Sequence, residues 1–197
     1  MRVFVAVFPP REVLDALAAL LERVRRPDDR ISWVKRDNLH YTLRFLGELE
    51  PSRAEAAARA GHEAVRGTAP FEAALGEPGA FPDFRRPRVL WIGLAEGGPP
   101  LRLLAASLEE ALRREGFGRA DRPFAAHLTL GRVREPGSPA GAEAASRLRE
   151  ERADGRFRVD TLTVVRSQLN PRGSIYTPLA QCPLQGTSPG TPPEEKA

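Results

Sequence analysis

A chain of 197 residues, 41% hydrophobic and 28% charged, has the composition of one soluble globular domain and excludes fibrous and membrane-spanning classes. The lone cysteine, Cys182, excludes an internal disulfide and any zinc site built from cysteines. The longest early apolar run, Val3–Phe8, is far shorter than the ~18 residues that a membrane helix needs. It also lacks the basic lead-in of a signal peptide, so we expect a cytoplasmic protein without membrane contact.

The formal net charge is +4, and its chemistry is mostly that of arginine. Only Lys35 and Lys196 are lysines, which leaves 28 of the 30 basic residues as arginine. Guanidinium groups bind phosphate oxygens in bidentate geometry, so the bias suits an anionic partner. A GC-rich genome also favours arginine, so the charge permits RNA binding without establishing it.

The first half of the chain predicts alternating strands and helices. Val3–Phe8 alternates apolar residues and runs into two prolines, as a strand entering a turn does. In 11–26 the leucines and valines fall on one helical face. Ser52 and Glu55 form a capping-box pattern that opens an alanine-rich helix to about Val65. The other strands expected in this half are Ile31–Val34, Leu39–Leu46 and Phe71–Leu75.

The second half predicts more strands than helices. Gly116 is expected to cap a helix over Pro100–Glu115. The segment 156–166 alternates regularly and predicts one long strand. The remaining elements expected here are strands at Arg88–Leu94, Ala126–Val133 and Ser174–Leu179 and a short helix near Ala142–Glu151. An α+β fold of mainly antiparallel sheet follows, with one domain over 1–184 and a disordered tail over 185–197.

Two of the three histidines stand in matching tetrapeptides. Residues 40–43 read HYTL and residues 127–130 read HLTL, 87 residues later. Both copies lie within a predicted strand that follows a strand–helix stretch, so the two halves are predicted to be diverged repeats. His62 has no such counterpart and is expected at the surface.

The spacing within each copy predicts a shared surface. Side chains two residues apart in a strand point to the same face. His40 and Thr42 therefore project together, and so do His127 and Thr129, while the residues between them face a core. A pseudo-twofold relation between the two strands would place two imidazoles and two hydroxyls around one cleft.

Two histidines around one phosphate suit the cleavage of a strained phosphodiester. A neutral imidazole takes a proton from water, and an imidazolium gives one to the leaving oxygen. Unperturbed pKa values near ~6.5 allow opposite protonation states near neutral pH. The hydroxyls of Thr42 and Thr129 can donate to the non-bridging oxygens. The mechanism requires no metal, and no Walker or Rossmann glycine pattern predicts a nucleotide cofactor.

The sequence resembles the two-histidine (2H) phosphoesterases, and within them the bacterial and archaeal RNA 2′,3′-cyclic phosphodiesterases once called 2′-5′ RNA ligases. The resemblance spans about Met1–Leu184. It is carried by the opening strand-proline pattern and by the segments WVKRDNLHYTLRFLGE, FPDFRRPRVLWIGL, FAAHLTLGRV and SQLNPRGSIYTPL.

This resemblance implies a bilobal fold with an antiparallel sheet in each lobe and the cleft between them. It implies hydrolysis of a terminal RNA 2′,3′-cyclic phosphate to a 2′-phosphate, with His40 as proton donor and His127 as proton acceptor. An arginine after the second motif matches Arg132, which strict alternation places opposite His127, so its contact with phosphate requires a bulge or the strand's end. Alternation alone places Arg44 on the face of His40.

Other functions use the same residues. The alternatives are 2′-5′ ligation of RNA (tRNA) halves, hydrolysis of a small cyclic nucleotide, and RNA-end binding without catalysis. The strand aromatics Trp33, Tyr41 and Phe45 are assigned to the core and left out of the site. The protein is expected to act as a monomer on RNA ends.

Overall fold

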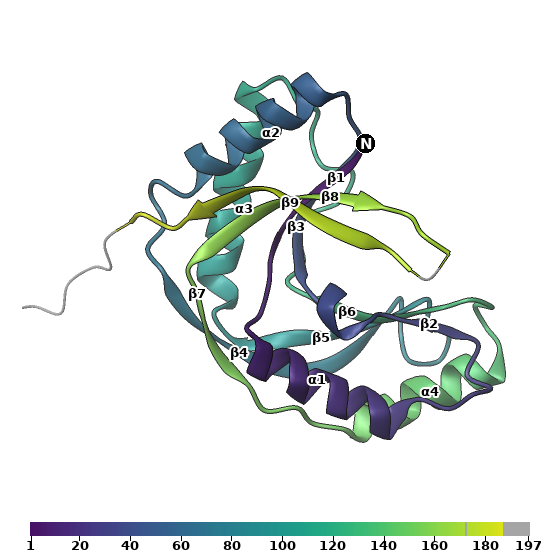
Figure 1. Cartoon of the computed structure of the whole chain (residues 1–197). Coiled ribbons are helices and arrows are strands. Elements are labelled where there is room, and N and C mark those ends of the chain that lie inside the picture. The colour runs from purple at the N-terminus through teal and green to yellow at the C-terminus, as the bar shows by residue number, and fades with distance from the viewer. Residues whose placement is uncertain (172, 187–197) are drawn as a thin grey trace, which may run out of the picture.

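The computed structural model describes residues 1–171 and 173–186 (Figure 1). The elements are, in chain order, β1 (Arg2–Val7), α1 (Arg11–Val24), β2 (Ile31–Trp33), a 3-10 turn η1 (Arg36–Asn38), β3 (Tyr41–Glu48), α2 (Pro51–Ala64), β4 (Phe71–Phe81), β5 (Val89–Glu96), α3 (Gly98–Arg114), β6 (Leu128–Val133), α4 (Pro139–Glu150), β7 (Arg156–Val159), β8 (Thr161–Gln168) and β9 (Ile175–Pro183).

The strands form one antiparallel sheet in the order β7-β4-β5-β6-β3-β1-β8-β9, with β2 added on β6. The two halves of this sheet meet between β3 and β6, where one residue pair, Tyr41 and Leu128, joins them. The α+β class with mainly antiparallel sheet is therefore confirmed. The expected separate sheets are instead two arms of one curled sheet.

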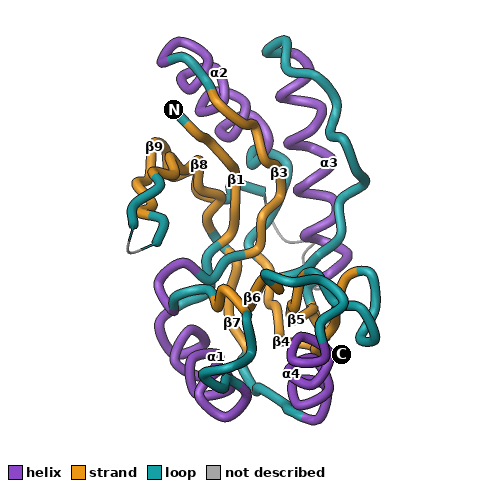
Figure 2. The backbone as a smooth tube through the Cα atoms, turned by 90° about the vertical axis from the view of Figure 1, so that its right-hand side faces the viewer, coloured by secondary structure: helices purple, strands orange, loops and turns teal. Residues whose placement is uncertain are grey.

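Two lobes follow from this sheet (Figures 1 and 2). Helices α2 and α3 lie side by side in the lobe of β1, β3, β8 and β9. Helices α1 and α4 lie side by side against β4–β7 in the other lobe. Each half of the chain therefore contributes a helix and strands to both lobes.

The predicted repeat extends well beyond the histidine motifs. β1 and β5, α1 and α3, and β3 and β6 each begin 87 residues apart. The strand order is symmetric about the β3–β6 junction, with β1 matching β5 and β8 matching β4. The two halves are thus related by a pseudo-twofold axis through this junction.

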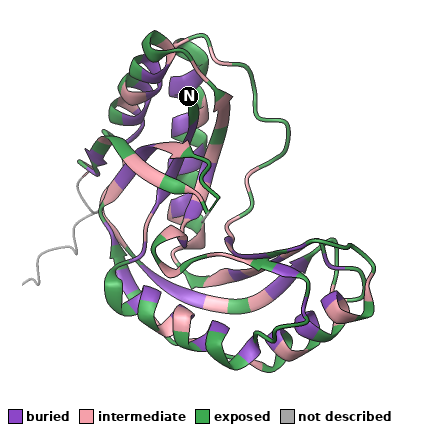
Figure 3. Cartoon of the chain, turned by 45° about the vertical axis from the view of Figure 1, so that its right-hand side comes forward, coloured by how far each residue is buried: buried purple, intermediate pink, exposed green. Residues whose placement is uncertain are grey.

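The helices bury one apolar face each and turn a polar face to solvent (Figure 3). On α3 the leucines at 104, 108 and 112 are fully buried against the sheet. Each such side chain contributes roughly 1.5–3 kcal/mol of burial free energy. Gly116 follows this helix at φ 77°, which confirms the predicted glycine cap.

Two local predictions are wrong. The α2 helix begins at Pro51 after Glu50, with no side-chain cap, because proline pre-sets the backbone angle of the first helical turn. The capping box of Ser52 and Glu55 is not formed. The single strand expected over 156–166 is two strands interrupted at Asp160, because β7 pairs with β4 in one lobe and β8 pairs with β1 in the other.

Strand β4 runs to Phe81, six residues beyond the prediction, although it contains glycines and Pro78. Irregular pairing with β5 accommodates the proline. A side chain at Gly79 would lie 2.2 Å from Trp91, so the glycine leaves room for the indole ring on this face.

Near the C-terminus, Gln185 and Gly186 donate backbone hydrogen bonds to Val65 and Thr68. The rest of the predicted disordered tail, 187–197, lies outside the described residues. Among the helices that are described, none is long and apolar enough to cross a membrane.

Candidate active site

The two motif histidines lie one residue before β3 and β6, not inside the strands as predicted. Nδ1 of His40 lies 2.6 Å from the Asn38 carbonyl oxygen, and Nδ1 of His127 lies 2.8 Å from that of Ala125. A carbonyl oxygen can only accept, so each Nδ1 carries a proton and donates it. In both rings Nε2 is therefore the atom that can exchange a proton with substrate.

Aromatic rings surround His40 on the β1 side. Phe4 stacks on its imidazole at 4.8 Å, and Phe8 and Tyr176 lie 5.3 Å and 5.4 Å away. These contacts limit the ring to one orientation and exclude water from its faces.

His127 has a smaller aromatic environment. Phe81 meets its ring edge-on at 5.1 Å and Trp91 at 6.2 Å. The aromatic rings come from β4 and β5, the counterparts of β8 and β1, so the two imidazoles occupy equivalent places in the two lobes.

Burial lowers the pKa of both histidines below the ordinary value of 6.5, and hydrogen bonds to the backbone oppose this shift in each case. The positive charge of Arg132 lowers both pKa values further, and that of His127 also lowers the pKa of His40. The two imidazoles and the guanidinium are therefore close enough to interact electrostatically.

Four of the five predicted site residues line one cavity of about 230 Å³: His40, Thr42, Thr129 and Arg132. His127 is not among its lining residues. The predicted inward residues of the motifs are buried, with Tyr41 at 1% exposure and Leu128 at 0%. The expected core face of each motif is confirmed, and the use of the other face as a substrate site stays a prediction.

A bulge in β6 carries Arg132 to the cavity. Trp91 of β5 pairs with Thr129 and Leu90 pairs with Gly131, so β6 has one extra residue at Leu130. The bulge changes the alternation, and Arg132 lies on the same face as Thr129. This is the geometry that the sequence left open for this arginine.

An equivalent bulge in β3 places Arg44 on the face opposite the one predicted for it. Ala6 pairs with Thr42 and Val5 pairs with Arg44, which leaves one extra residue between them. Arg44 therefore points away from the cavity and contacts Glu109 of α3 and Gly118, so its predicted place beside His40 is wrong.

Sequence reasoning missed several cavity residues. The assignment of Phe45 to the core is wrong, because its side chain is 52% exposed and lines the cavity. The Arg2 guanidinium lies 5.4 Å from its ring centre. The repeat distance could have revealed Phe45, because it stands 87 residues before Arg132. Tyr176 of β9 also lines the cavity, but nothing in its local sequence marks it.

The side chains that commonly bind metal ions are scattered over residues 1–171 and 173–186. No group of three or more histidine, cysteine, aspartate or glutamate side chains suitable for a metal ion occurs in these residues.

Known proteins share this sequence and fold. A family model described as the 2′-5′ RNA ligase superfamily matches residues 9–171. An RNA 2′,3′-cyclic phosphodiesterase of Thermus thermophilus is 37% identical over 191 residues, covering 94% of this chain and 91% of the relative. One of Archaeoglobus fulgidus is 37% identical over 183 residues, covering 91% and 98%.

Solved structures agree. The protein TT0787 of Thermus thermophilus matches with a TM-score of 0.70 and 33% identity, covering 95% of this chain and 100% of that one. E. coli LigT complexed with 3′-AMP matches with a TM-score of 0.73 and 27% identity, covering 93% and 97%. The chain therefore belongs to the 2′-5′ RNA ligase superfamily, in the family of the RNA 2′,3′-cyclic phosphodiesterases.

Proposed function

We propose that the protein hydrolyses the 2′,3′-cyclic phosphate at the end of an RNA to a 2′-phosphate. The observation that carries this proposal is the pair of imidazoles that donate from Nδ1 to the backbone and keep Nε2 for substrate. Paired acid–base groups of this kind suit a phosphodiester whose ring strain already favours opening.

His40 is the proton donor and His127 the proton acceptor in this proposal. An exposed aromatic ring such as Phe45 offers a stacking surface to the terminal base, which brings its ribose to the lobe of His40. The leaving O3′ belongs to that ribose and takes a proton from His40. Water attacks from the opposite side, where His127 removes its proton, and the P–O3′ bond breaks in line.

The remaining cavity residues act on the charge of the phosphate. Thr42 and Thr129 donate hydroxyl hydrogen bonds to the non-bridging oxygens, and the Arg132 guanidinium binds them through two N–H groups. Because negative charge on these oxygens grows toward the transition state, fixed donors lower the barrier more than they tighten substrate binding.

The test is an oligoribonucleotide ending in a 2′,3′-cyclic phosphate, incubated in excess chelator with the wild type and with the His40→Ala and His127→Ala variants. The product is identified by mass and by resistance to a 3′-specific phosphatase. We expect a 2′-phosphate from the wild type and a loss of at least ~10²-fold in rate in either variant.

A His62→Ala variant is the matched control, because this histidine is exposed on α2. An unchanged RNA end with folded wild-type protein contradicts the proposal. A second strand with a free 5′-hydroxyl and a mononucleotide cyclic phosphate, added in parallel, distinguish ligation and small-substrate hydrolysis from the proposed reaction.

A further inference from the structure

The chain between α3 and His127 is a long exposed connection (Figure 3). We call residues 118–126 the strap. The strap leaves the lobe of α3 and ends directly before His127 in the other lobe. Its Ala125 carbonyl also accepts the hydrogen bond that orients the His127 ring. Movement of the strap is therefore transmitted to the imidazole.

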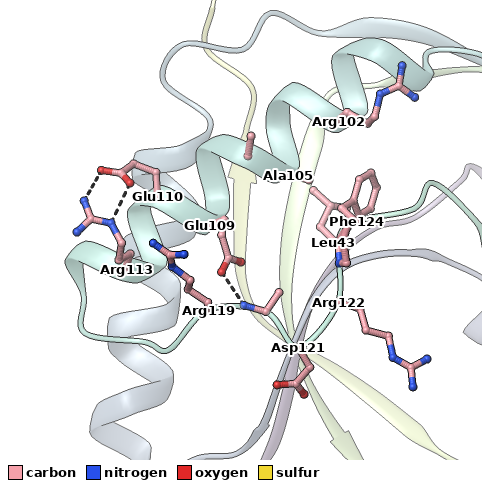
Figure 4. Close-up of a pocket in the computed structure, with 13 residues that line it drawn as sticks. Leu43, Arg102, Ala105, Glu109, Glu110, Arg113, Arg119, Asp121, Arg122 and Phe124 are labelled. Carbon is pink, nitrogen blue, oxygen red and sulfur yellow. Dashed lines mark hydrogen bonds and ion pairs between the residues drawn. The ribbon is translucent and has the colours of Figure 1, made fainter.

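The strap has few attachments to the rest of the protein. A cavity of about 700 Å³ separates much of it from α3, with Glu109, Phe124 and Leu43 among the lining residues (Figure 4). Phe124 and Ala126 pack against the core at the end nearer His127. Over the described part of the chain, only two hydrogen bonds from other elements reach residues 118–126.

Both of these hydrogen bonds involve a pair of neighbouring side chains, those of Arg44 and Glu109. Arg44 of β3 donates from Nη2 to the Gly118 carbonyl at 2.6 Å. The backbone N–H of Ala120 donates to Oε1 of Glu109 at 2.9 Å, the dashed line from Glu109 in Figure 4. Arg44 and Glu109 are in turn joined by an ion pair of 3.4 Å. The side chain of Arg44 is only 13% exposed and that of Glu109 is 35% exposed, so the guanidinium is held inside the protein and water reaches the pair mainly at the carboxylate.

The bulge in β3 turns Arg44 toward the strap. The second half of the repeat has no arginine at the equivalent position. The counterpart of Arg44 87 residues later is Gly131, where a side chain would lie 2.7 Å from Trp33. The second half uses this position for close packing. In the first half an arginine at the same position reaches across to the strap.

We propose that Arg44 and Glu109 are positioning residues, a clasp that holds the strap on β3 and so keeps His127 opposite His40. This role rests on the proposed two-histidine reaction. Arg44 follows the His40 motif on the same strand, so the clasp links the strand of one histidine to the backbone that precedes the other. Since a displacement of about 1 Å can cost about 10²-fold in rate, an anchor at this place controls catalysis without touching substrate.

The test compares Arg44→Ala and Glu109→Ala with Arg59→Ala. Arg59 forms a similar ion pair of 2.8 Å with Glu115 but does not contact the strap. We expect kcat on the cyclic-phosphate oligonucleotide to fall about 10- to 100-fold in both clasp variants, with KM changed less than about threefold. Arg59→Ala should keep wild-type kcat. Glu109→Gln retains an oxygen acceptor for Ala120 and should recover part of the loss.

A structural readout separates positioning from loss of stability. Ring-proton NMR measures the titration of His127 directly. Burial lowers the pKa of His127, and its hydrogen bond to the Ala125 carbonyl of the strap raises it, so a loosened strap should shift this pKa from its wild-type value. This measurement needs no substrate and holds even if the wild type shows no phosphodiesterase activity.

Two results would contradict the proposed role of the clasp. One is an unchanged His127 titration in folded Arg44→Ala and Glu109→Ala, and the other is a loss of kcat in Arg59→Ala equal to the loss in these two variants. If the alanine variants do not fold, Arg44→Met and Glu109→Leu, which keep side-chain bulk and remove both hydrogen bonds to the strap, serve instead. Wild-type kcat and an unchanged His127 titration in both of these variants would then contradict the proposal.

Discussion

At the residue scale, the two histidines share the orientation of their rings as well as the sequence that follows them. Each donates Nδ1–H to the carbonyl oxygen two residues earlier, so both expose the same ring nitrogen. This arrangement is set by the backbone just before each strand, which explains why both histidines lie at a strand start. The difference between them comes from their surroundings: three aromatic rings contact His40 and two contact His127.

The lowered pKa values of His40 and His127 predict the pH dependence of the rate. In the free enzyme, burial and Arg132 favour the neutral imidazoles, so a protonated donor forms only at more acidic pH. Bound cyclic phosphate is an anion and raises the pKa of an adjacent imidazolium. We therefore expect two bell-shaped profiles, with the optimum of kcat/KM at lower pH than that of kcat.

Initial rates measured from about pH 4.5 to about pH 9 at several substrate concentrations give both profiles. A flat profile between about pH 5 and 8 would contradict acid–base catalysis by these histidines. An optimum of kcat/KM above that of kcat would contradict the electrostatic argument.

Substitutions of Arg132 distinguish the effect of its positive charge on the rate from the effect of its paired N–H donors. Lysine at this position keeps the positive charge and loses the paired N–H donors. We expect Arg132→Ala to lower kcat by about 10²- to 10³-fold and Arg132→Lys to lower it by a smaller factor. Arg134, which hydrogen-bonds Ser32, is the control for removal of a nearby arginine. Equal effects of Arg132→Ala and Arg134→Ala would exclude a specific phosphate contact.

At the scale of elements, the paired bulges decide which side chains reach the cavity. Without them, strict alternation would place Arg44 in the site and turn Phe45 and Arg132 away from it. Gly131 lies next to the extra residue of the bulge in β6, and Trp33 and Ile31 of β2 pack closely against it.

The Gly131→Ala variant tests this packing. The new methyl group would lie 2.7 Å from Trp33 and 2.8 Å from Ile31, so one of these side chains or β6 itself must move. We expect a loss of about 1–3 kcal/mol in the free energy of unfolding, measured by urea denaturation, and reduced activity because Arg132 follows directly. Gly67→Ala, where the added methyl meets nothing within 4 Å, is the control. Equal stability of the two variants would show that β6 adapts without cost.

At the scale of the whole molecule, the lobes do not coincide with the repeats. Helix α1 and strand β4 of the first half lie in one lobe, whereas β1 and β3 lie in the other. Each half alone would therefore expose the apolar faces that the other half covers.

Because each half of the chain covers apolar faces of the other, we predict that fragments 1–86 and 87–184 are each largely unfolded in isolation. Far-ultraviolet circular dichroism and amide-proton dispersion of the separate fragments, beside the full chain, measure this. A cooperative unfolding transition in either fragment alone would contradict the interdependence of the two halves.

Local features of this protein follow from its sequence alone. Periodicity placed most of the strands and helices to within a few residues, because burying one face needs little more than a regular pattern, but it missed the last six residues of β4. The two HxT motifs and their distance indicated the candidate site residues and the repeat. The expected boundaries failed at Pro51, which begins α2 one residue before the predicted cap, and at Asp160, where the partner strand changes.

The relations between distant segments depend on how the chain folds in three dimensions. The bulges arise from pairing with β1 and β5, so no property of HYTLRF or HLTLGR alone reveals that Phe45 enters the site and Arg44 leaves it. The single join at Tyr41 and Leu128, the exchange of helices between lobes and the contact of Arg44 with the strap also depend on residues far apart in the chain. Periodicity indicates which face of a strand is buried, but the partner strand decides where that periodicity is interrupted.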